Sequence, residues 1–251
     1  MPLLGFSLGP GAGSELCLVY PLARGGNLED RLLRSPAGLE RLAMLGCVSP
    51  PPLAWQRRVR ILRDVVRALI YLHKEASPQV LHRDVKPSNV LIDADGTALL
   101  SDVGTATVAE AHTPADMTHR STTVVRGTPG YLDPLISNAL QHSEMTDGYA
   151  TAITVLVTLV GRPAVGLKEE CRHLLRNPDR PERWQPPGVP DVTAGGWPDG
   201  VAGRLADTVA GLTEEYKVDR MPLTDALRVR QGHELPSISA RLIHDGGHFP
   251  Q

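Results

Sequence analysis

The sequence predicts a domain of the α+β class that is mainly α-helical. One observation is the segment 54–73, whose apolar residues recur mostly at three- and four-residue steps, as on one face of an amphipathic helix. A second is the pair of short apolar runs at 90–92 and 98–100, which flank turn-forming residues and indicate a β-hairpin. A third is the segment 151–160, which is almost entirely apolar or threonine and predicts a helix buried on most sides.

Composition argues against several classes of protein. The 251 residues carry 26 Lys+Arg and 28 Asp+Glu, a formal net charge of −2, which does not suit a dedicated nucleic-acid or anionic-membrane binder. Hydrophobic residues make up 41% of the chain, yet no uninterrupted apolar run approaches the roughly 20 residues that span a bilayer. The 3 cysteines (Cys17, Cys47 and Cys171) include no C-x-x-C pair, so we expect a reducing, cytoplasmic setting.

The N-terminal half contains three further predicted elements. Residues 1–22 alternate short apolar runs with a glycine-rich turn and predict a β-hairpin. After a pair of glycines, Asn27 is suited to cap a short helix that ends at Leu33. The proline-containing stretch 35–52 indicates a surface insertion before the long helix at 54–73.

The C-terminal half is more irregular. Residues 105–130 are rich in Thr, Ser and Gly and lack apolar periodicity, so we expect a long loop there. The proline-rich stretch 177–200 predicts a linker between helices. Three further helices are expected, at 166–176, 201–214 and 222–230.

One polar pattern carries the functional prediction. The segment Val80–Ile92 reads V-L-H-R-D-V-K-P-S-N-V-L-I, with an amphipathic helix predicted before it and a second short strand after it. This arrangement is similar to the catalytic loop of the protein kinases, H-R-D-x-K-x-x-N followed by an apolar triplet. The resemblance implies transfer of a phosphoryl group from ATP to a protein, with Mg²⁺ as the cofactor.

The same resemblance gives each polar residue of this loop a role. Phosphoryl transfer needs a carboxylate that orients the attacking hydroxyl and accepts its proton, and Asp84 stands at that position. Lys86 would contact the γ-phosphate, and Asn89 would bind one Mg²⁺ through its amide oxygen. A lysine two residues after the aspartate resembles the serine/threonine kinases rather than the tyrosine kinases, so Ser/Thr acceptors are expected.

Two downstream features extend the resemblance. The segment Ser101–Gly104 stands where kinases have D-F-G, and Asp102 would there chelate the Mg²⁺ that bridges the phosphates, with Val103 in place of Phe. Arg83 makes the loop similar to those regulated by phosphorylation of the activation segment, because a guanidinium can pair bidentately with a phosphate. The nearest acceptors for such a phosphate are Ser121, Thr122 and Thr123.

The segment Gly127–Pro134 resembles the G-T-x-G-Y-x-x-P-E sequence that closes kinase activation segments. Its Thr128 would hydrogen-bond near the catalytic aspartate and lysine. Leu135 stands where kinases have the final Glu, so the usual buried ion pair is not expected and Arg220 would have another partner or water. Asp147 resembles the carboxylate that clamps the catalytic-loop backbone from below.

The segment Leu16–Leu28 resembles a kinase hinge. Tyr20 would be the gatekeeper, the carbonyl of Pro21 and the N–H of Ala23 would meet the adenine edge, and Leu91 would lie beneath the base. These features together look most like the receptor-like and interleukin-1-receptor-associated kinase group. They imply a protein-kinase-like C-lobe with a hinge and a remnant N-lobe hairpin, divided as 1–22 for the hairpin and hinge start, 23–231 for the C-lobe and 232–251 for a loose tail.

Before this hinge the sequence shows no glycine-rich loop, strand lysine or helix glutamate, all of which a full kinase domain carries. Three explanations stay open: an active serine/threonine kinase with a truncated gene model, a pseudokinase-like binding module, and a non-kinase protein. The intact catalytic and metal-binding residues favour the enzyme, whereas the missing N-lobe elements, Val103 and Leu135 favour the binding module.

The resemblance also implies partners. These are ATP, a protein substrate with a Ser/Thr acceptor, and an upstream receptor or activating kinase. No nucleic acid and no membrane segment are expected, and a membrane-anchored parent protein stays open.

Overall fold

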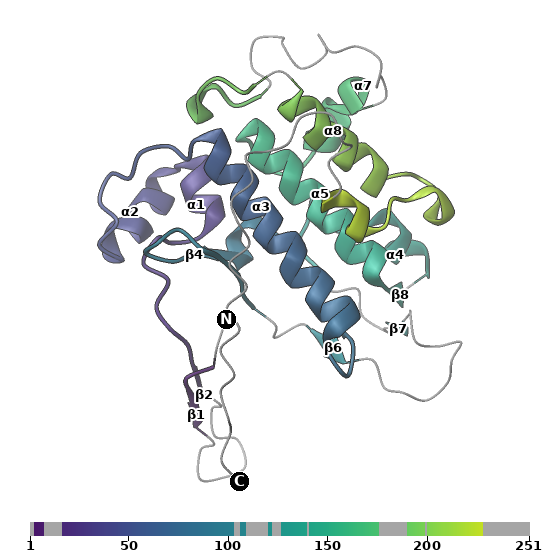
Figure 1. The fold of residues 1–251 in the computed structure, drawn as a ribbon, viewed down its shortest axis with the longest axis horizontal. Helices are drawn as coiled ribbons and strands as arrows, with labels where there is room; N and C mark the ends of the chain where they lie inside the picture. Colours follow the sequence, from purple (N-terminus) through teal and green to yellow (C-terminus); the bar gives the residue numbers. More distant parts are fainter. Residues whose placement is uncertain are drawn as a thin grey trace.

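The computed structural model describes residues 3–7, 17–102, 106–108, 120–121, 127–139, 141–175, 190–198 and 200–227. Within these ranges the helices form one body, and the strands pair only in two-stranded antiparallel sheets. Figure 1 shows this body, with the N-terminal hairpin projecting from it. The fold is therefore a mainly α-helical α+β fold, as the sequence predicts.

The N-terminal hairpin pairs β1 (Gly5–Ser7) with β2 (Cys17–Val19), so that Phe6 lies opposite Leu18. Both of these side chains are exposed. The predicted hairpin is confirmed for the strands, while its glycine-rich turn lies outside the described residues.

Two short helices follow the hinge segment. α1 (Leu28–Leu33) begins after Asn27, whose side chain accepts a hydrogen bond from a backbone N–H of the first turn, as predicted. α2 (Pro36–Met44) lies inside the stretch that the sequence indicated only as a surface insertion. Its start signal is Ser35 as the N-cap followed by proline, a pair that is typical of a helix beginning.

Two long helices build the core. α3 (Trp55–Ile70) follows the predicted amphipathic pattern and continues as one π-helical segment, η1 (Tyr71–Glu75). α5 (Glu144–Val160) is buried along nearly its whole length and packs against α3 and against α8 (Val201–Leu212). The prediction placed the start of α5 at residue 151, because its first turns contain polar residues that the structure buries.

The remaining strands are short and hold the catalytic-loop region in place. β4 (Val90–Ile92) and β5 (Ala98–Leu100) form the second predicted hairpin, which is confirmed. The 3-10 turn η2 (Pro87–Asn89) precedes it. Two further pairs are β3 (Val80–Leu81) with β6 (Thr107–Val108), and β7 (Arg120–Ser121) with β8 (Gln141–His142).

The C-terminal part is built from short elements. They are α4 (Pro134–Ala139), α6 (Leu167–Glu170), α7 (Arg172–Leu175), η5 (Val192–Ala194), η6 (Lys217–Asp219) and η7 (Leu223–Leu227). The single helix predicted at 166–176 is thus two helices interrupted at Cys171, and the one predicted at 222–230 is a 3-10 helix over its described part.

The fold also bears on the cysteines and on membrane-spanning helices. Cys17, Cys47 and Cys171 are all free thiols. Among the helices of the described ranges, none has the length and apolar character needed to cross a membrane.

Candidate active site

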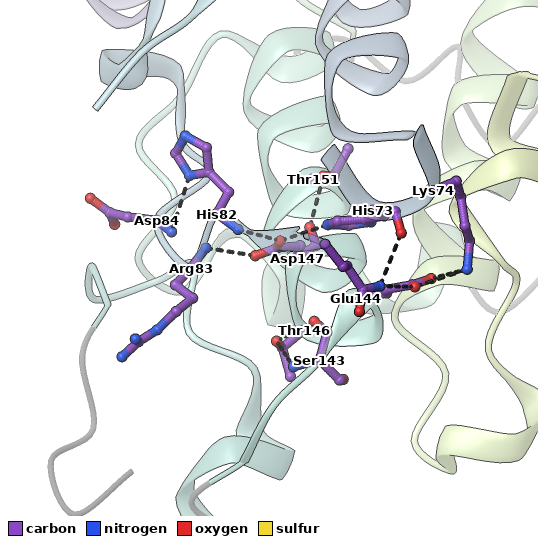
Figure 2. Close-up of polar contacts among 11 residues, drawn as sticks. His73, Lys74, His82, Arg83, Asp84, Ser143, Glu144, Thr146, Asp147 and Thr151 are labelled. Carbon is purple, nitrogen blue, oxygen red and sulfur yellow. Dashed lines mark hydrogen bonds and ion pairs between the residues drawn. The ribbon is translucent and has the colours of Figure 1, made fainter. Parts of the chain in front are cut away.

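Asp147, in the first turns of α5, binds the backbone of the predicted catalytic loop. Its Oδ2 accepts a hydrogen bond from the N–H of His82 at 2.8 Å, and its Oδ1 accepts one from the N–H of Arg83 at 2.8 Å. The ring of His73, in η1, lies with Nε2 2.8 Å from the same Oδ2. Figure 2 shows these three contacts converging on the carboxylate. The predicted clamp is confirmed.

The clamp stays ionised although it is buried. Burial by itself raises the pKa of Asp147, but the hydrogen bonds from His73 and from the two backbone N–H groups outweigh burial and lower the pKa below its ordinary value. Its neighbour His82 is fully buried, and its Nε2 lies 3.0 Å from the carbonyl oxygen of Ser101. His82 therefore packs in the interior.

Three of the predicted site residues meet around one carboxylate. Lys86 Nζ lies 2.6 Å from Asp84 Oδ2 and donates a hydrogen bond to Thr128 Oγ1 at 2.7 Å. The Thr128 hydroxyl in turn donates to Asp84 Oδ1 at 2.7 Å. Because Thr128 lies 44 positions after Asp84, this contact joins the end of the predicted activation segment to the catalytic loop.

The side chain of Asn89 completes this cluster. Its Nδ2 donates to the backbone oxygen of Asp84 at 2.8 Å and to Asp84 Oδ2 at 3.1 Å. Burial acts to raise the pKa of Asp84, but the hydrogen bonds from Lys86, Thr128 and Asn89 and the charge of Lys86 outweigh it, so the pKa is lowered. The carboxylate is therefore charged and oriented at neutral pH.

The residues predicted to bind Mg²⁺ suit that ion. With Nδ2 of Asn89 occupied as a donor, its Oδ1 is the atom left for a metal, and oxygen is the ligand that Mg²⁺ prefers. The N–H and the hydroxyl of Ser101 both donate to the Asn89 carbonyl, at 2.9 and 3.0 Å. Asp102, the next residue, is exposed and is thereby held close to Asn89. The amide oxygen of Asn89 and the carboxylate of Asp102 are both oxygen ligands of the kind that a hard divalent cation binds.

Backbone conformation also marks this region. The non-glycine residues with positive φ in the described chain are Arg34, Ser49, Arg83 (φ 70°) and Asp102 (φ 62°). Two of these are predicted site residues. Left-handed backbone is costly for such residues and gathers at functional sites, so its presence here supports the site assignment.

The predicted adenine-binding residues of the hinge precede a segment that is hydrogen-bonded to β4. Gly25 N–H donates to the Ile92 carbonyl at 2.8 Å, and Ile92 N–H donates to the Gly26 carbonyl at 2.8 Å. Leu91 bridges to Asn27 in the same ladder. Tyr20, Pro21 and Ala23 thus immediately precede a segment that is hydrogen-bonded to β4, and Leu91 and Tyr20 are half-buried while Ala23 is buried. Their contacts with a nucleotide stay predictions.

The predicted phosphate-regulated residues are only partly described. The backbone of Ser121 lies in β7, opposite Gln141 of β8. Thr122, Thr123 and Val103 lie outside the described residues.

The structure identifies the partner of Arg220. Its guanidinium forms a buried ion pair with Asp133 through two hydrogen bonds, one of them 3.0 Å from NH2 to Oδ1. Leu135 does remove the carboxylate expected at its own position. Asp133, two residues earlier, replaces it, and the sequence-based interpretation had assigned Asp133 no role.

Arg58 is a further residue that the sequence-based interpretation missed. It is fully buried in α3, donates to the carbonyl oxygens of Leu53 and Thr158 at 2.8 Å each, and pairs with Asp191 at 2.6 Å. It joins α3 to α5 and to the segment before η5. Its neighbours in sequence are solvent-facing arginines, and the only signal for its burial was its position on the apolar face of the helix.

Comparison with known proteins gives a consistent result. A family model described as "protein kinase domain" matches residues 12–186. U-box domain-containing protein 33 of Arabidopsis thaliana is 33% identical over 230 residues, which is 91% of this chain and 25% of that protein. A probable receptor-like protein kinase of the same plant is 38% identical over 150 residues, 60% of this chain and 16% of that protein.

A third relative, a probable LRR receptor-like serine/threonine-protein kinase of Arabidopsis thaliana, is 34% identical over 162 residues, 63% of this chain and 13% of that protein. The chain thus spans a quarter or less of the length of these three relatives.

Proposed function

The chain belongs to the protein kinase domain family and resembles its receptor-like members, and from that premise we propose that it transfers the γ-phosphoryl group of ATP to serine or threonine side chains of proteins. The observation that carries this proposal is the cluster in which Lys86, Thr128 and Asn89 all bind the side chain of Asp84. A loop with only a structural role would not need a charged, half-buried carboxylate that is fixed by three side chains.

Asp84 would act on the acceptor. Its carboxylate is ionised and fixed, so it can accept a hydrogen bond from the substrate hydroxyl and direct a lone pair of that oxygen toward the phosphorus. As the new O–P bond forms, the hydroxyl proton passes to Asp84. The bond between the phosphorus and the β-phosphate oxygen breaks, and ADP leaves with that electron pair.

Lys86 and the predicted metal ligands would stabilise charge. Lys86 Nζ lies within hydrogen-bond distance of both Asp84 and Thr128, so it would put a positive charge beside the attacking oxygen. Asn89 and Asp102 would hold Mg²⁺, which neutralises charge on the phosphates when it is bound. Thr128 accepts a second hydrogen bond from Lys86 Nζ, which would keep the lysine from binding only to the carboxylate of Asp84.

The pseudokinase-like binding module is the second candidate. Leu135 was one reason for it, since a missing ion pair would loosen the end of the activation segment. The Asp133–Arg220 ion pair weakens this reason, because it fixes the same segment to the C-terminal elements. The enzyme is therefore the better supported of the two.

The setting of the protein is part of the proposal. Relatives named as receptor-like kinases support an upstream receptor or activating kinase as a partner. Three free thiols support a reducing compartment such as the cytoplasm.

The test is a phosphotransfer assay with Mg·ATP and a generic Ser/Thr protein substrate such as casein. We expect Asp84→Asn to lower kcat by about 10²- to 10⁴-fold while the affinity for ATP is retained, since a positioned general base contributes about that factor. Asp95→Asn is the matched control, because Asp95 is an exposed turn carboxylate that accepts hydrogen bonds from Thr97, and its change should leave kcat unaffected.

Calorimetry with Mg·ATP separates the two candidates. Binding that is lost in Asp102→Ala, together with phosphotransfer, supports the enzyme. Binding without any transfer by a folded chain would support the binding module, and an Asp84→Asn variant as active as the control would remove Asp84 from the mechanism.

A further inference from the structure

His142, the last residue of β8, is a buried histidine with unpaired ring nitrogens. Its side chain is almost fully inaccessible, with 1% of its surface exposed. Among the described residues, no hydrogen-bond partner reaches either Nδ1 or Nε2. The large majority of buried side-chain polar atoms in proteins have such a partner, so an imidazole with neither nitrogen bonded calls for an explanation.

A small cavity with several polar groups in its lining lies beside this ring. Its volume is about 10 Å³, and its lining includes His142 together with Arg83 and Asp84 of the catalytic loop, Thr128 of the activation segment and Thr146 of α5. This volume is close to the room that one water molecule needs. A neutral imidazole has one donor and one acceptor nitrogen, and a water molecule can serve either of them while binding the polar groups on the other walls.

The surroundings oppose a charge on this ring. Burial lowers the pKa of His142, the guanidinium of Arg83 lowers it further, and only the carboxylate of Asp147 acts in the opposite direction. His142 also directly precedes Ser143, the N-cap of the 17-residue helix α5, where the positive end of the helix dipole disfavours a cation.

Other charged or titratable groups also line the cavity. The carboxylate of Asp84 is bound to its own three side-chain partners, and that of Asp133 is paired with the buried arginine of the C-terminal segment. Tyr131 is neutral, because burial raises its pKa far above the usual value. Asp147 already accepts three hydrogen bonds. No carboxylate in the cavity is therefore left without partners to offset an imidazolium.

The position of His142 connects three functional segments. In the backbone ladder it lies opposite Arg120 of β7, which belongs to the predicted activation segment. The residue after it caps α5 through a reciprocal hydrogen-bond pair with Thr146. One turn further along α5, Asp147 holds the catalytic loop. A change at His142 would thus act on the activation segment and the catalytic loop together.

We propose that His142 is a positioning residue of the phosphotransfer site: as a neutral imidazole bonded to one water molecule, it holds the β7–β8 pair and Thr128 against the catalytic loop, and its protonation in mild acid releases them. The effect on catalysis rests on the function proposed above. The effect on β7–β8 pairing does not.

The first test is a pH titration of the intact chain followed by NMR of the histidine ring nitrogens and the backbone amides, with His142→Asn used to assign the His142 signals. The expected result is a neutral ring at pH 7.5 that takes up its proton only below the ordinary value of about 6.5, with the β7 and β8 amide signals changing over the same pH range. A ring that titrates at or above about 6.5, or β7–β8 amides indifferent to its protonation, would overturn the proposal.

The second test compares pH profiles of phosphotransfer. For the wild type, kcat is expected to fall about tenfold for each pH unit below the pKa of His142, with little change in KM for ATP, because one proton abolishes the productive arrangement. His142→Asn keeps a donor and an acceptor but cannot be charged, so its acid limb should shift to lower pH. His142→Leu removes the hydrogen bonds and should lower kcat at every pH without an acid limb of its own.

The two tests fail in distinguishable ways. A folded wild type that transfers no phosphate at pH 7.5 contradicts the proposed function, while the NMR titration still decides the role of His142. If His142→Asn keeps the wild-type acid limb, the positioning role is wrong even though the kinase is active.

Discussion

The catalytic-loop region and the N-terminal hairpin are held in different ways. Around Asp84 and Asp147, five hydrogen bonds join groups that lie 42 to 74 positions apart in the sequence, and most of these groups are buried or half-buried. In the hairpin, the large side chains of the strands are exposed, with Phe6 at 64% and Leu18 at 56%. Beyond the hairpin, the backbone bonds of Gly25 and Gly26 with Ile92 join the hinge segment to the body.

This difference separates two parts of the proposed chemistry. The groups that would act on the acceptor hydroxyl and the γ-phosphate are preorganised by the body of the molecule itself. The segment that would bind adenine has a body contact on one side, through β4, and leads on the other side into strands with exposed apolar faces. Substitutions in the catalytic-loop region should therefore lower the free energy of unfolding, whereas substitutions in the hairpin should leave it nearly unchanged.

The largest effect is expected from Asp147→Ala. This change leaves two backbone N–H groups and the ring of His73 without their buried acceptor, so the free energy of unfolding should fall by about 3–5 kcal/mol. Urea unfolding measures it. Asp147→Asn, which keeps one acceptor oxygen, should lose less, and a loss below about 1 kcal/mol for alanine would show that the clamp contributes little to stability.

The second effect concerns the buried ion pair at the other end of the activation segment. Asp133→Ala should lower the free energy of unfolding by about 3 kcal/mol, because it leaves the charge of Arg220 buried without a partner. The double change Asp133→Leu with Arg220→Met removes both charges and should recover most of that loss.

A double variant as unstable as the single one would mean that packing, rather than the unpaired charge, causes the loss. Chemical denaturation of Asp133→Leu, Arg220→Met and the double variant, compared as a double-mutant cycle, decides between these explanations.

These two ion-pair regions show what the sequence could and could not predict. The clamp by Asp147 and the contacts of Thr128 with Asp84 and Lys86 follow the family spacing, so the sequence predicted them. The partner of Arg220 was not predicted, because Asp133 stands two residues away from the expected position. A carboxylate can serve the same cation from a neighbouring position whenever the backbone turns suitably, and sequence spacing does not report that turn.

The fold was predictable to a similar degree. Period-based reasoning found α3, α8 and the β4–β5 hairpin, since burial of one face leaves a clear apolar pattern. It placed the start of α5 too late, because the first turns of this helix contain Thr146 and Asp147, which look polar in sequence although the structure buries both. The burial of His142 left no sequence signal at all.

A third, smaller effect is expected on the titration of Asp84. Lys86→Met removes a hydrogen bond and a positive charge while burial remains, so the pKa of Asp84 should rise. In the wild type the folded-state pKa lies below that of the unfolded chain, so this carboxylate stabilises the fold above about pH 3.9, and the contribution is lost as the pH falls.

Carboxyl ¹³C NMR over an acid titration measures this shift. Lys74→Met is the control, since that exposed lysine pairs with Glu144 and not with Asp84. If the two lysine variants shift the Asp84 titration equally, Lys86 is not its charge partner.

The smallest change in the free energy of unfolding is expected in the hairpin, and it tests directly how the hairpin differs from the helical body. Phe6→Ser replaces a side chain that is 64% exposed, and such surface changes usually alter the free energy of unfolding by no more than about 0.5 kcal/mol. Leu62→Ser, in the buried face of α3, is the contrasting variant and should cost several times more, because it places a hydroxyl in the core. Urea unfolding of both variants over a range of protein concentrations makes the comparison quantitative. A Phe6→Ser loss above about 1 kcal/mol that grows with concentration would show that the hairpin face is covered by another molecule in solution, since only binding to the folded state makes stability depend on concentration.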